Sequence, residues 1–152
     1  MRGPNGEDLP GAVLFCCNQN AIRSPMAAAL FKQLYGKFAY VDSAGLRPGE
    51  SDPFAVEAMR EVGLDIASHH AKTFEELHDG SFDLIVTLTP ESHHRALEMA
   101  RDQAIAVEYW PILDPTAVMG NREQRIAAYR AVRDELARRI RERFATRPAP
   151  QA

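Results

Sequence analysis

Hydrophobic residues fall into short continuous runs that alternate with helical repeats. The first run, AVLFC over residues 12–16, lies between Gly11 and a polar loop, which is typical of a strand buried on both faces. After the loop, apolar side chains recur at helical spacing until Gly36, a residue type that often ends a helix. This part of the chain therefore predicts a strand, a loop and a helix, with the strand in the centre of a sheet.

The same alternation continues to the end of the chain. Further strands are predicted over 38–43, 82–88 and 105–110, and helices over 53–62, 90–102 and 121–144, with a short helix at the capping-box pattern Thr73/Glu76. Strands that alternate with helices predict an α/β fold, here a three-layer, doubly wound, four-stranded parallel sheet with helices on both faces. We expect a single domain over residues 12–144, with flexible tails over 1–11 and 145–152.

Composition excludes several classes of partner. The 152 residues carry a formal net charge of -3, and a nucleic-acid surface would normally show a basic balance. No apolar run is long enough to span a membrane, and residues 1–11 lack the apolar core of a signal peptide. The two cysteines, Cys16 and Cys17, are adjacent, so they cannot form the spaced disulfide framework of small secreted domains. We expect a cytoplasmic domain that contacts neither nucleic acid nor membrane.

The loop after the first strand carries the most informative residues. It reads CNQNAIRSP over residues 17–25, with five residues between Cys17 and Arg23 and a helix directly afterwards. Such a loop can turn its backbone N–H groups toward one point, next to the positive end of the helix dipole. Arg23 adds a planar, bidentate donor for an oxyanion, and the same field favours a nucleophilic thiolate at Cys17. The predicted anion-binding residues are Asn18, Gln19, Asn20, Ala21, Ile22 and Arg23.

Two more side chains complete this interpretation. Ser24 can donate its hydroxyl to the sulfur, and Pro25 is tolerated at a first helical position. Asp114, after the last predicted strand, can protonate a leaving group and later activate water. Each has an ordinary alternative, since Ser24 could be a helix cap and Asp-Pro often begins a turn.

Other candidates are weaker. The pairs His69-His70 and His93-His94 are adjacent in sequence, so their side chains diverge, and no cysteine joins them at zinc spacing. We therefore expect no metal and no cofactor. Cys16 should point to the opposite side of its strand from Cys17 and belong to the core.

These motifs resemble the low-molecular-weight protein tyrosine phosphatase family and the thioredoxin-coupled arsenate reductases that share its fold. The resemblance covers about residues 12–144. It is carried by residues 13–15, Cys17, Asn20, 23–27, Ser43-Ala44-Gly45, 82–85 and Asp114-Pro115. It implies a nucleophile, a phosphate clamp, a thiolate partner and a general acid, namely Cys17, Arg23, Ser24 and Asp114, with the loop supported by Asn20, Ser43 and His69.

Several positions depart from the family pattern. Gln19 stands where glycine is usual, so either the local backbone accepts a side chain or the anion cage is altered. Ile22 replaces a second loop cysteine, and Thr89 stands where the reductases have their second catalytic cysteine. Thr116 and Ala117 replace tyrosines, and residues 46–49 lack an aromatic wall.

The resemblance and the departures together leave three functional hypotheses. The leading one is a phosphomonoesterase that forms a phosphocysteine and acts on a phosphorylated protein or a small phosphate ester. The second is an arsenate reductase that uses an external small thiol, and the third is a non-catalytic module that binds phosphoproteins or oxyanions such as phosphate, sulfate or arsenate. Arg47, near the expected site, is either a contact for a second negative charge on the substrate or a solvated loop residue.

Overall fold

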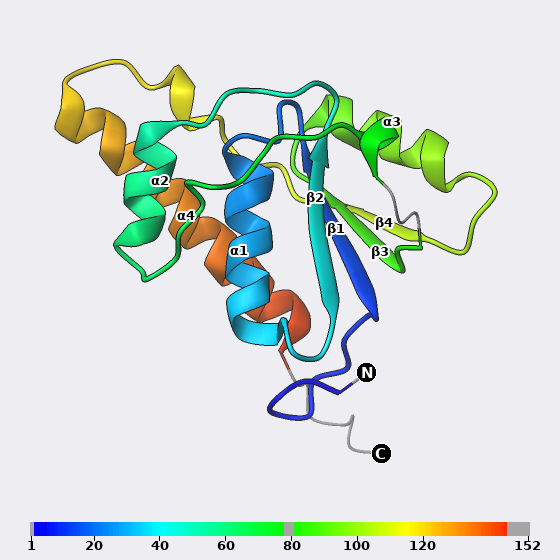
Figure 1. Cartoon of the computed structure of the whole chain (residues 1–152). Helices are drawn as coiled ribbons and strands as arrows, with labels where there is room; N and C mark the ends of the chain where they lie inside the picture. Colours follow the sequence, from blue (N-terminus) through cyan, green and yellow to red (C-terminus); the bar gives the residue numbers. More distant parts are fainter. Residues whose placement is uncertain (1, 78–80, 146–152) are drawn as a thin grey trace.

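The computed structural model describes residues 2–77 and 81–145. In that part of the chain a four-stranded, fully parallel sheet has the order β2-β1-β3-β4 (Figure 1). The strands are β1 (Ala12–Cys17), β2 (Tyr40–Gly45), β3 (Leu84–Thr87) and β4 (Ala106–Tyr109). The apolar β1 lies between two other strands, and its side chains are buried on both faces because helices cover each side of the sheet.

Helices cover both faces of the sheet. Three of them pack together on one face, and one covers the other face (Figure 1). The first group is α1 (Arg23–Tyr35), α2 (Pro53–Arg60) and α4 (Arg122–Phe144), and the opposite helix is α3 (Pro90–Ala100). Two short 3₁₀ helices, η1 (Phe74–Glu76) and η2 (Pro115–Ala117), lie in the connections. The predicted three-layer α/β fold is confirmed.

Polar caps begin three of these helices. The Asp52 carboxylate accepts the N–H of Phe54 at α2, the Thr89 hydroxyl accepts the N–H of Ser92 at α3, and the Asn121 amide accepts that of Gln124 at α4. These side chains satisfy N–H groups that have no partner within the helix.

Alternation along β1 divides the core into two parts. Val13, Phe15 and Cys17 belong to the apolar cluster beneath α1, α2 and α4, whereas Leu14 and Cys16 belong to the cluster beneath α3. Successive side chains of a strand point to opposite faces. The two neighbouring cysteines therefore lie on opposite sides of the sheet.

The structure differs from the prediction at three places. Helix α1 already begins at Arg23, so Pro25 is its third residue, where a missing N–H is still harmless. Strand β2 continues to Gly45, which puts Ser43 inside the strand instead of at its end. The segment before β1 lies against the domain, since Glu7 and Leu9 are only 5% and 3% exposed. The other predicted tail falls, from residue 146 on, outside the described residues.

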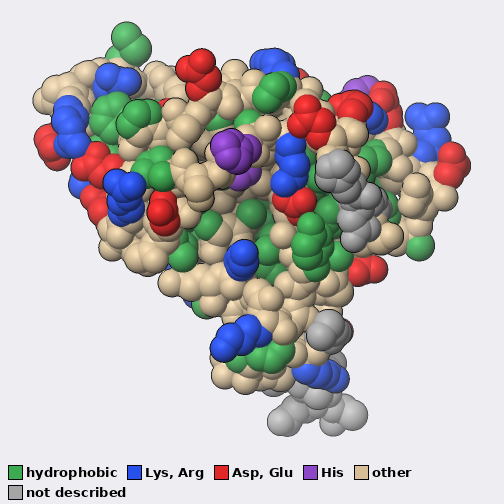
Figure 2. Space-filling model, viewed as in Figure 1, with side chains coloured by type: hydrophobic (Ala, Val, Ile, Leu, Met, Phe, Trp, Pro, Cys, Tyr) green, Lys and Arg blue, Asp and Glu red, His purple; other side chains and the backbone are tan. Residues whose placement is uncertain are grey.

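The surface over α2 and α4 carries mixed charge. Arg130 and Arg133 both pair with Glu61, and Arg138 contacts both Glu135 and Glu142. Figure 2 shows basic and acidic side chains interspersed over this end of the molecule. No helix among the described residues has the length and apolar character needed to cross a membrane.

Candidate active site

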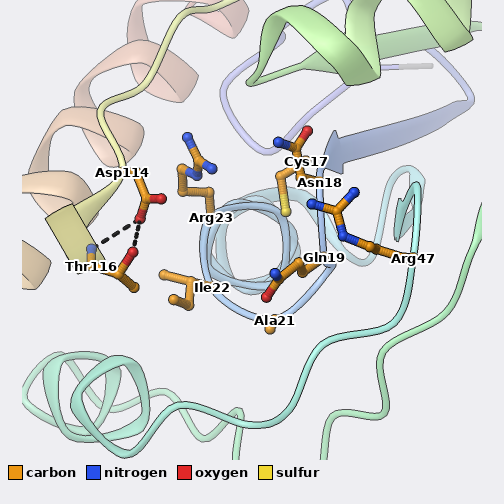
Figure 3. A pocket seen from close by; sticks show the side chains of 9 residues that line it. All are labelled: Cys17, Asn18, Gln19, Ala21, Ile22, Arg23, Arg47, Asp114 and Thr116. Carbon is orange, nitrogen blue, oxygen red and sulfur yellow. Dashed lines mark hydrogen bonds between the residues drawn. The ribbon is translucent and has the colours of Figure 1, made fainter.

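A pocket of about 170 Å³ lies beside the carboxyl end of β1 and the start of α1. Figure 3 looks toward the start of α1, with the lining side chains arranged around it. The lining residues are Cys17, Asn18, Gln19, Ala21, Ile22, Arg23, Arg47, Asp114 and Thr116. The pocket thus brings together the loop after β1, the loop after β2 and the loop after β4, as expected at the carboxyl edge of a parallel sheet.

Loop 17–23 turns its carbonyl groups outward. The Asn18 carbonyl accepts the N–H groups of Leu46 and Arg47 at 2.8 and 3.1 Å, and the Gln19 carbonyl accepts that of Gly49 at 2.8 Å. In a trans peptide the C=O and the following N–H point in opposite directions. The N–H groups of Gln19 and Asn20, which belong to the same two peptide planes, are therefore turned away from these donors and can meet an anion.

Gly45 allows the loop after β2 to approach this closely. A Cβ atom at Gly45 would lie 2.7 Å from the Asn20 nitrogen and 2.9 Å from the Asn18 carbonyl oxygen. Gln19 is not in the left-handed backbone region, so its side chain is compatible with the loop; that conformation occurs instead at Asn20, with φ 52°. The departure from glycine at Gln19 leaves the loop backbone unstrained at that residue.

A chain of hydrogen bonds leads to the Cys17 sulfur. The Asn20 Nδ2 group donates to Ser24 Oγ at 2.9 Å, and Ser24 Oγ lies 3.0 Å from Cys17 Sγ. Because the Ser24 oxygen accepts from Asn20, its own proton is free to point toward the sulfur. Asn20 and Ser24 are both fully buried, so this arrangement is fixed. Ser24 does not cap α1, which excludes the ordinary interpretation of that residue.

His69 holds Asn20 from outside the loop. Its Nε2 lies 2.9 Å from the Asn20 carbonyl oxygen and 3.1 Å from Asn20 Oδ1, which also accepts the Lys72 backbone N–H at 2.9 Å. Both neighbours of Nε2 are acceptors, so Nε2 carries the proton. Burial lowers the pKa of His69 and outweighs the opposing contact with the Asn20 backbone. The histidine therefore supports the loop in its neutral form.

Arg23 is the first residue of α1 and is half-buried. Its Nη1 group donates to the Ile112 carbonyl oxygen at 2.9 Å, which holds the guanidinium beside the pocket. The remaining N–H groups can meet an oxyanion, next to the unpaired N–H groups at the start of the helix. The loop after β4 thus sets the position of the predicted clamp.

Asp114 both caps a helix and lines the pocket. One carboxylate oxygen accepts the Thr116 N–H at 2.9 Å and the Thr116 hydroxyl at 2.7 Å (Figure 3). Burial raises the pKa of Asp114, but the two bonds from Thr116 and the charge of Arg23 outweigh it, so the pKa lies below its ordinary value. Asp114 therefore forms the turn and also lines the pocket, so the catalytic interpretation stays a prediction.

Ser43 and two large aromatic residues near the site lie outside the pocket lining. Ser43 is buried within β2, and no side-chain hydrogen bond joins it to the loop in the described part of the chain. Trp110 packs edge-on against Phe15, and Phe54 packs against Tyr129. The pocket consequently has no aromatic wall among the residues described.

His93 and Thr89 have structural partners. His93 Nδ1 lies 2.9 Å from Thr87 Oγ1, and the Thr89 hydroxyl contacts Asn18 Oδ1 at 2.7 Å. Residues 2–77 and 81–145 contain no group of three or more His, Cys, Asp or Glu side chains that could hold a metal ion. Thr89 thus helps to position the Asn18 side chain.

Comparison with known proteins agrees with this geometry. The sequence matches the family "Low molecular weight phosphotyrosine protein phosphatase" over residues 12–147. The chain belongs to this family. An arsenate reductase of Bacillus subtilis (strain 168) is 32% identical over 130 residues, which cover 86% of this chain and 92% of that protein.

Solved structures of phosphatase-family proteins have the same fold. An arsenate reductase in the phosphate-binding state has a TM-score of 0.73 at 28% identity, covering 88% of this chain and 96% of the other. A cysteine-to-serine variant of the arginine phosphatase YwlE, with a phosphorylated active-site serine, has a TM-score of 0.71 at 28% identity and covers 88% and 93%. The family therefore contains both kinds of protein, and each resembles this chain to a similar degree.

Sequence patterns alone missed the contacts that fix the pocket. The bond from Arg23 to the Ile112 carbonyl and the bond from the Lys72 backbone N–H to Asn20 involve main-chain atoms, which carry no residue signature. The sequence marks Thr116 only as a residue that stands where the family pattern has a tyrosine. Its position two residues after Asp114 is the spacing at which an aspartate accepts a backbone N–H, and this signal could have revealed the contact.

Proposed function

We propose that the protein is a phosphomonoesterase that works through a phosphocysteine at Cys17. The observation that carries the proposal is the 3.0 Å contact between Cys17 Sγ and Ser24 Oγ in a pocket that Arg23 and Asp114 also line. Binding an oxyanion requires neither a sulfur poised beside a hydroxyl nor a carboxyl group. The combination therefore favours catalysis over binding alone.

In the first step the Cys17 thiolate attacks phosphorus. The phosphoryl oxygens bind the N–H groups of loop 17–23 and the guanidinium of Arg23. The ester P–O bond breaks, its electron pair goes to the leaving oxygen, and Asp114 donates the proton that turns this oxygen into a hydroxyl. The product alcohol leaves a phosphorylated Cys17.

In the second step water replaces the sulfur. Asp114, now ionised, takes a proton from water as the oxygen attacks phosphorus. The S–P bond breaks, and its electron pair goes to sulfur. The resulting thiolate accepts a hydrogen bond from the Ser24 hydroxyl, which the Asn20 amide holds in place. Inorganic phosphate then leaves and the starting state is restored.

The negative charge of the substrate favours the protonated form of Asp114, which the first step requires. Without substrate, the contacts with Thr116 and the charge of Arg23 keep this carboxyl ionised. A bound phosphoryl group neutralises Arg23 and adds negative charge nearby, and both effects raise the pKa of Asp114. Protonation of the acid is thereby linked to substrate binding.

Arsenate reduction with an external thiol is the second candidate, because the curated relative from Bacillus subtilis is named an arsenate reductase. Here Cys17 displaces water from arsenate and forms an S–As bond. One external thiol then attacks the Cys17 sulfur, the electron pair of the S–As bond goes to arsenic and arsenite leaves, and a second thiol frees Cys17 from the mixed disulfide as the two external thiols leave joined in a disulfide. Cys16 cannot take the place of these thiols. It lies in the other core cluster, and burial, then the charges of Cys17 and Asp42, raises its pKa.

The deciding experiment measures both reactions with the same preparations. Steady-state hydrolysis of 4-nitrophenyl phosphate and glutathione-dependent reduction of arsenate are followed for the wild type, Cys17→Ser and the control Cys16→Ala. We expect phosphate release in the wild type and the control, and none in Cys17→Ser. Acid-quenched wild-type protein should carry phosphate on Cys17.

The possible outcomes separate the hypotheses. Arsenite formation without ester hydrolysis would support the reductase instead. Tight phosphate binding with neither reaction would indicate an oxyanion-binding module. Hydrolysis that persists in Cys17→Ser would contradict the proposed nucleophile.

A further inference from the structure

Arg47 places a second cation at the pocket without belonging to the anion-binding loop. Its side chain lines the pocket, and Figure 3 shows Arg47 and Asp114 on opposite sides of Cys17. The backbone N–H of Arg47 donates to the Asn18 carbonyl at 3.1 Å, so the start of this side chain is tied to the loop. The backbone of Arg47 is therefore fixed in position, and its guanidinium can act in the same pocket as the Cys17 sulfur.

The charge of Arg47 is not neutralised by the described part of the chain. Within residues 2–77 and 81–145 no carboxylate pairs with its guanidinium, whereas Arg130 and Arg133 on α4 are both held by Glu61. Asp114 is engaged with Thr116 on the other side of the pocket. An exposed arginine that is unpaired at a pocket rim can accept a carboxylate or phosphate from a ligand through its bidentate fork.

Catalysis does not require this second cation. Arg23 and the loop N–H groups already suffice to bind one phosphoryl group, and the rim beyond them has no aromatic side chain that would select a phenyl ring. At this part of the rim the charged side chain is that of Arg47. The side chain that can discriminate between substrates at this point is thus Arg47.

We propose that Arg47 forms a second anion subsite, so that the preferred substrates are phosphate esters carrying a further carboxylate or phosphate close to the scissile phosphate. This inference rests on the proposed function, since it names the class of ester that the phosphatase accepts. The shared chemistry is an acidic group near the ester, whether on a small molecule or on the residue next to a phosphotyrosine.

The test compares two esters that differ in one charge. 4-Carboxyphenyl phosphate and 4-carbamoylphenyl phosphate have nearly the same shape, but only the first has a second anionic group. We expect the wild type to favour the carboxylate ester in kcat/KM by roughly three- to twenty-fold, the range of an exposed to partly desolvated ion pair. Arg47→Ala should remove most of this preference, and salt should weaken it in the wild type.

Arg101→Ala is the matched control. Arg101 is an exposed arginine at the end of α3 that is absent from the pocket lining, so its loss changes the net charge equally without touching the site. This variant should keep the wild-type preference. Phosphotyrosine peptides with Asp or Asn next to the phosphorylated residue form the second arm, which shows whether the acidic group is read on peptides or only on small esters.

A binding measurement keeps the inference testable without turnover. Calorimetry with Cys17→Ser compares 4-carboxybenzylphosphonate with 4-carbamoylbenzylphosphonate, with and without Arg47→Ala. Tighter binding of the carboxylate that depends on Arg47 supports the subsite even if hydrolysis fails and the proposed function is wrong. Equal binding of the two compounds, or a preference that Arg47→Ala leaves unchanged, overturns the inference whether or not the esters are hydrolysed.

Discussion

Replacing Ser24 by alanine tests how the site handles the sulfur as a leaving group. The hydroxyl lies 3.0 Å from Cys17 Sγ and accepts the Asn20 amide at 2.9 Å, with Ser24 and Asn20 both fully buried. Ser24→Ala removes the donor to the thiolate and leaves the Asn20 amide without this acceptor. The variant should therefore lose both activity and stability.

The magnitudes follow from these two contacts. A hydrogen bond to a charged group contributes about 1.5–3 kcal/mol, which corresponds to a roughly 10- to 150-fold loss in the step where the thiolate departs. The buried donor left on Asn20 should lower the free energy of unfolding by about 1–3 kcal/mol. Formation of the phosphocysteine should slow less, because there the thiolate attacks instead of leaving.

Stopped-flow hydrolysis of 4-nitrophenyl phosphate distinguishes the two steps. Ser24→Ala should release a burst of nitrophenolate close to one equivalent per enzyme, followed by slow turnover. Thr87→Val is the control, because Thr87 is also fully buried and its hydroxyl contacts His93 and the Glu108 carbonyl at 2.9 and 3.1 Å. That variant should lose stability without showing a burst.

Two results would refute this reasoning. The first is Ser24→Ala with wild-type turnover, which would mean that the hydroxyl does not act on the sulfur. The second is slow turnover with no burst and no phosphorylated enzyme, which would place the defect before the phosphocysteine forms.

Three further predictions concern other groups of the site. Asp114→Asn should lower turnover by about 10²–10⁴-fold for alkyl phosphates and by less for 4-nitrophenyl phosphate, whose leaving group needs no proton; equal losses would contradict the role of Asp114 as an acid. Iodoacetamide should label Cys17 much faster than Cys16, because burial raises the pKa of Cys16, and phosphate should protect Cys17; peptide mass spectrometry with equal labelling of both would argue against an assembled loop. Burial also lowers the pKa of His69 in the folded protein, so the unfolded chain binds its proton first, near pH 6.5, and the free energy of unfolding should fall as the pH drops from about 7 to 5. Urea titrations should show a flatter pH dependence for His69→Gln than for the wild type.

Local sequence patterns are enough to predict the layers of the fold and the loop that carries Cys17 and Arg23. Continuous apolar runs and period-3.6 repeats are local, and they placed the four strands and the four α-helices of the described residues to within a few residues of their positions in the structure; the short helix η2 was not predicted. The spacing of Cys17 and Arg23 is local too, because both lie on one loop between a buried strand and a helix. These features depend on neighbours in the chain, so they can be read without coordinates.

The hydrogen-bond partners that surround this loop, by contrast, are seen only in the folded protein. We predicted that Ser43 braces the loop, but β2 continues past Ser43. The hydrogen bonds to the loop come instead from the backbone N–H groups of Leu46, Arg47 and Gly49, and Gly45 allows their close approach. Arg23 and Asn20 each have a main-chain partner that is distant in sequence, 89 and 52 residues away. Contacts of this kind depend on how strands and loops meet at one edge of the sheet. Because nearly every residue type has the same main-chain atoms, no pattern of residue types predicts such contacts.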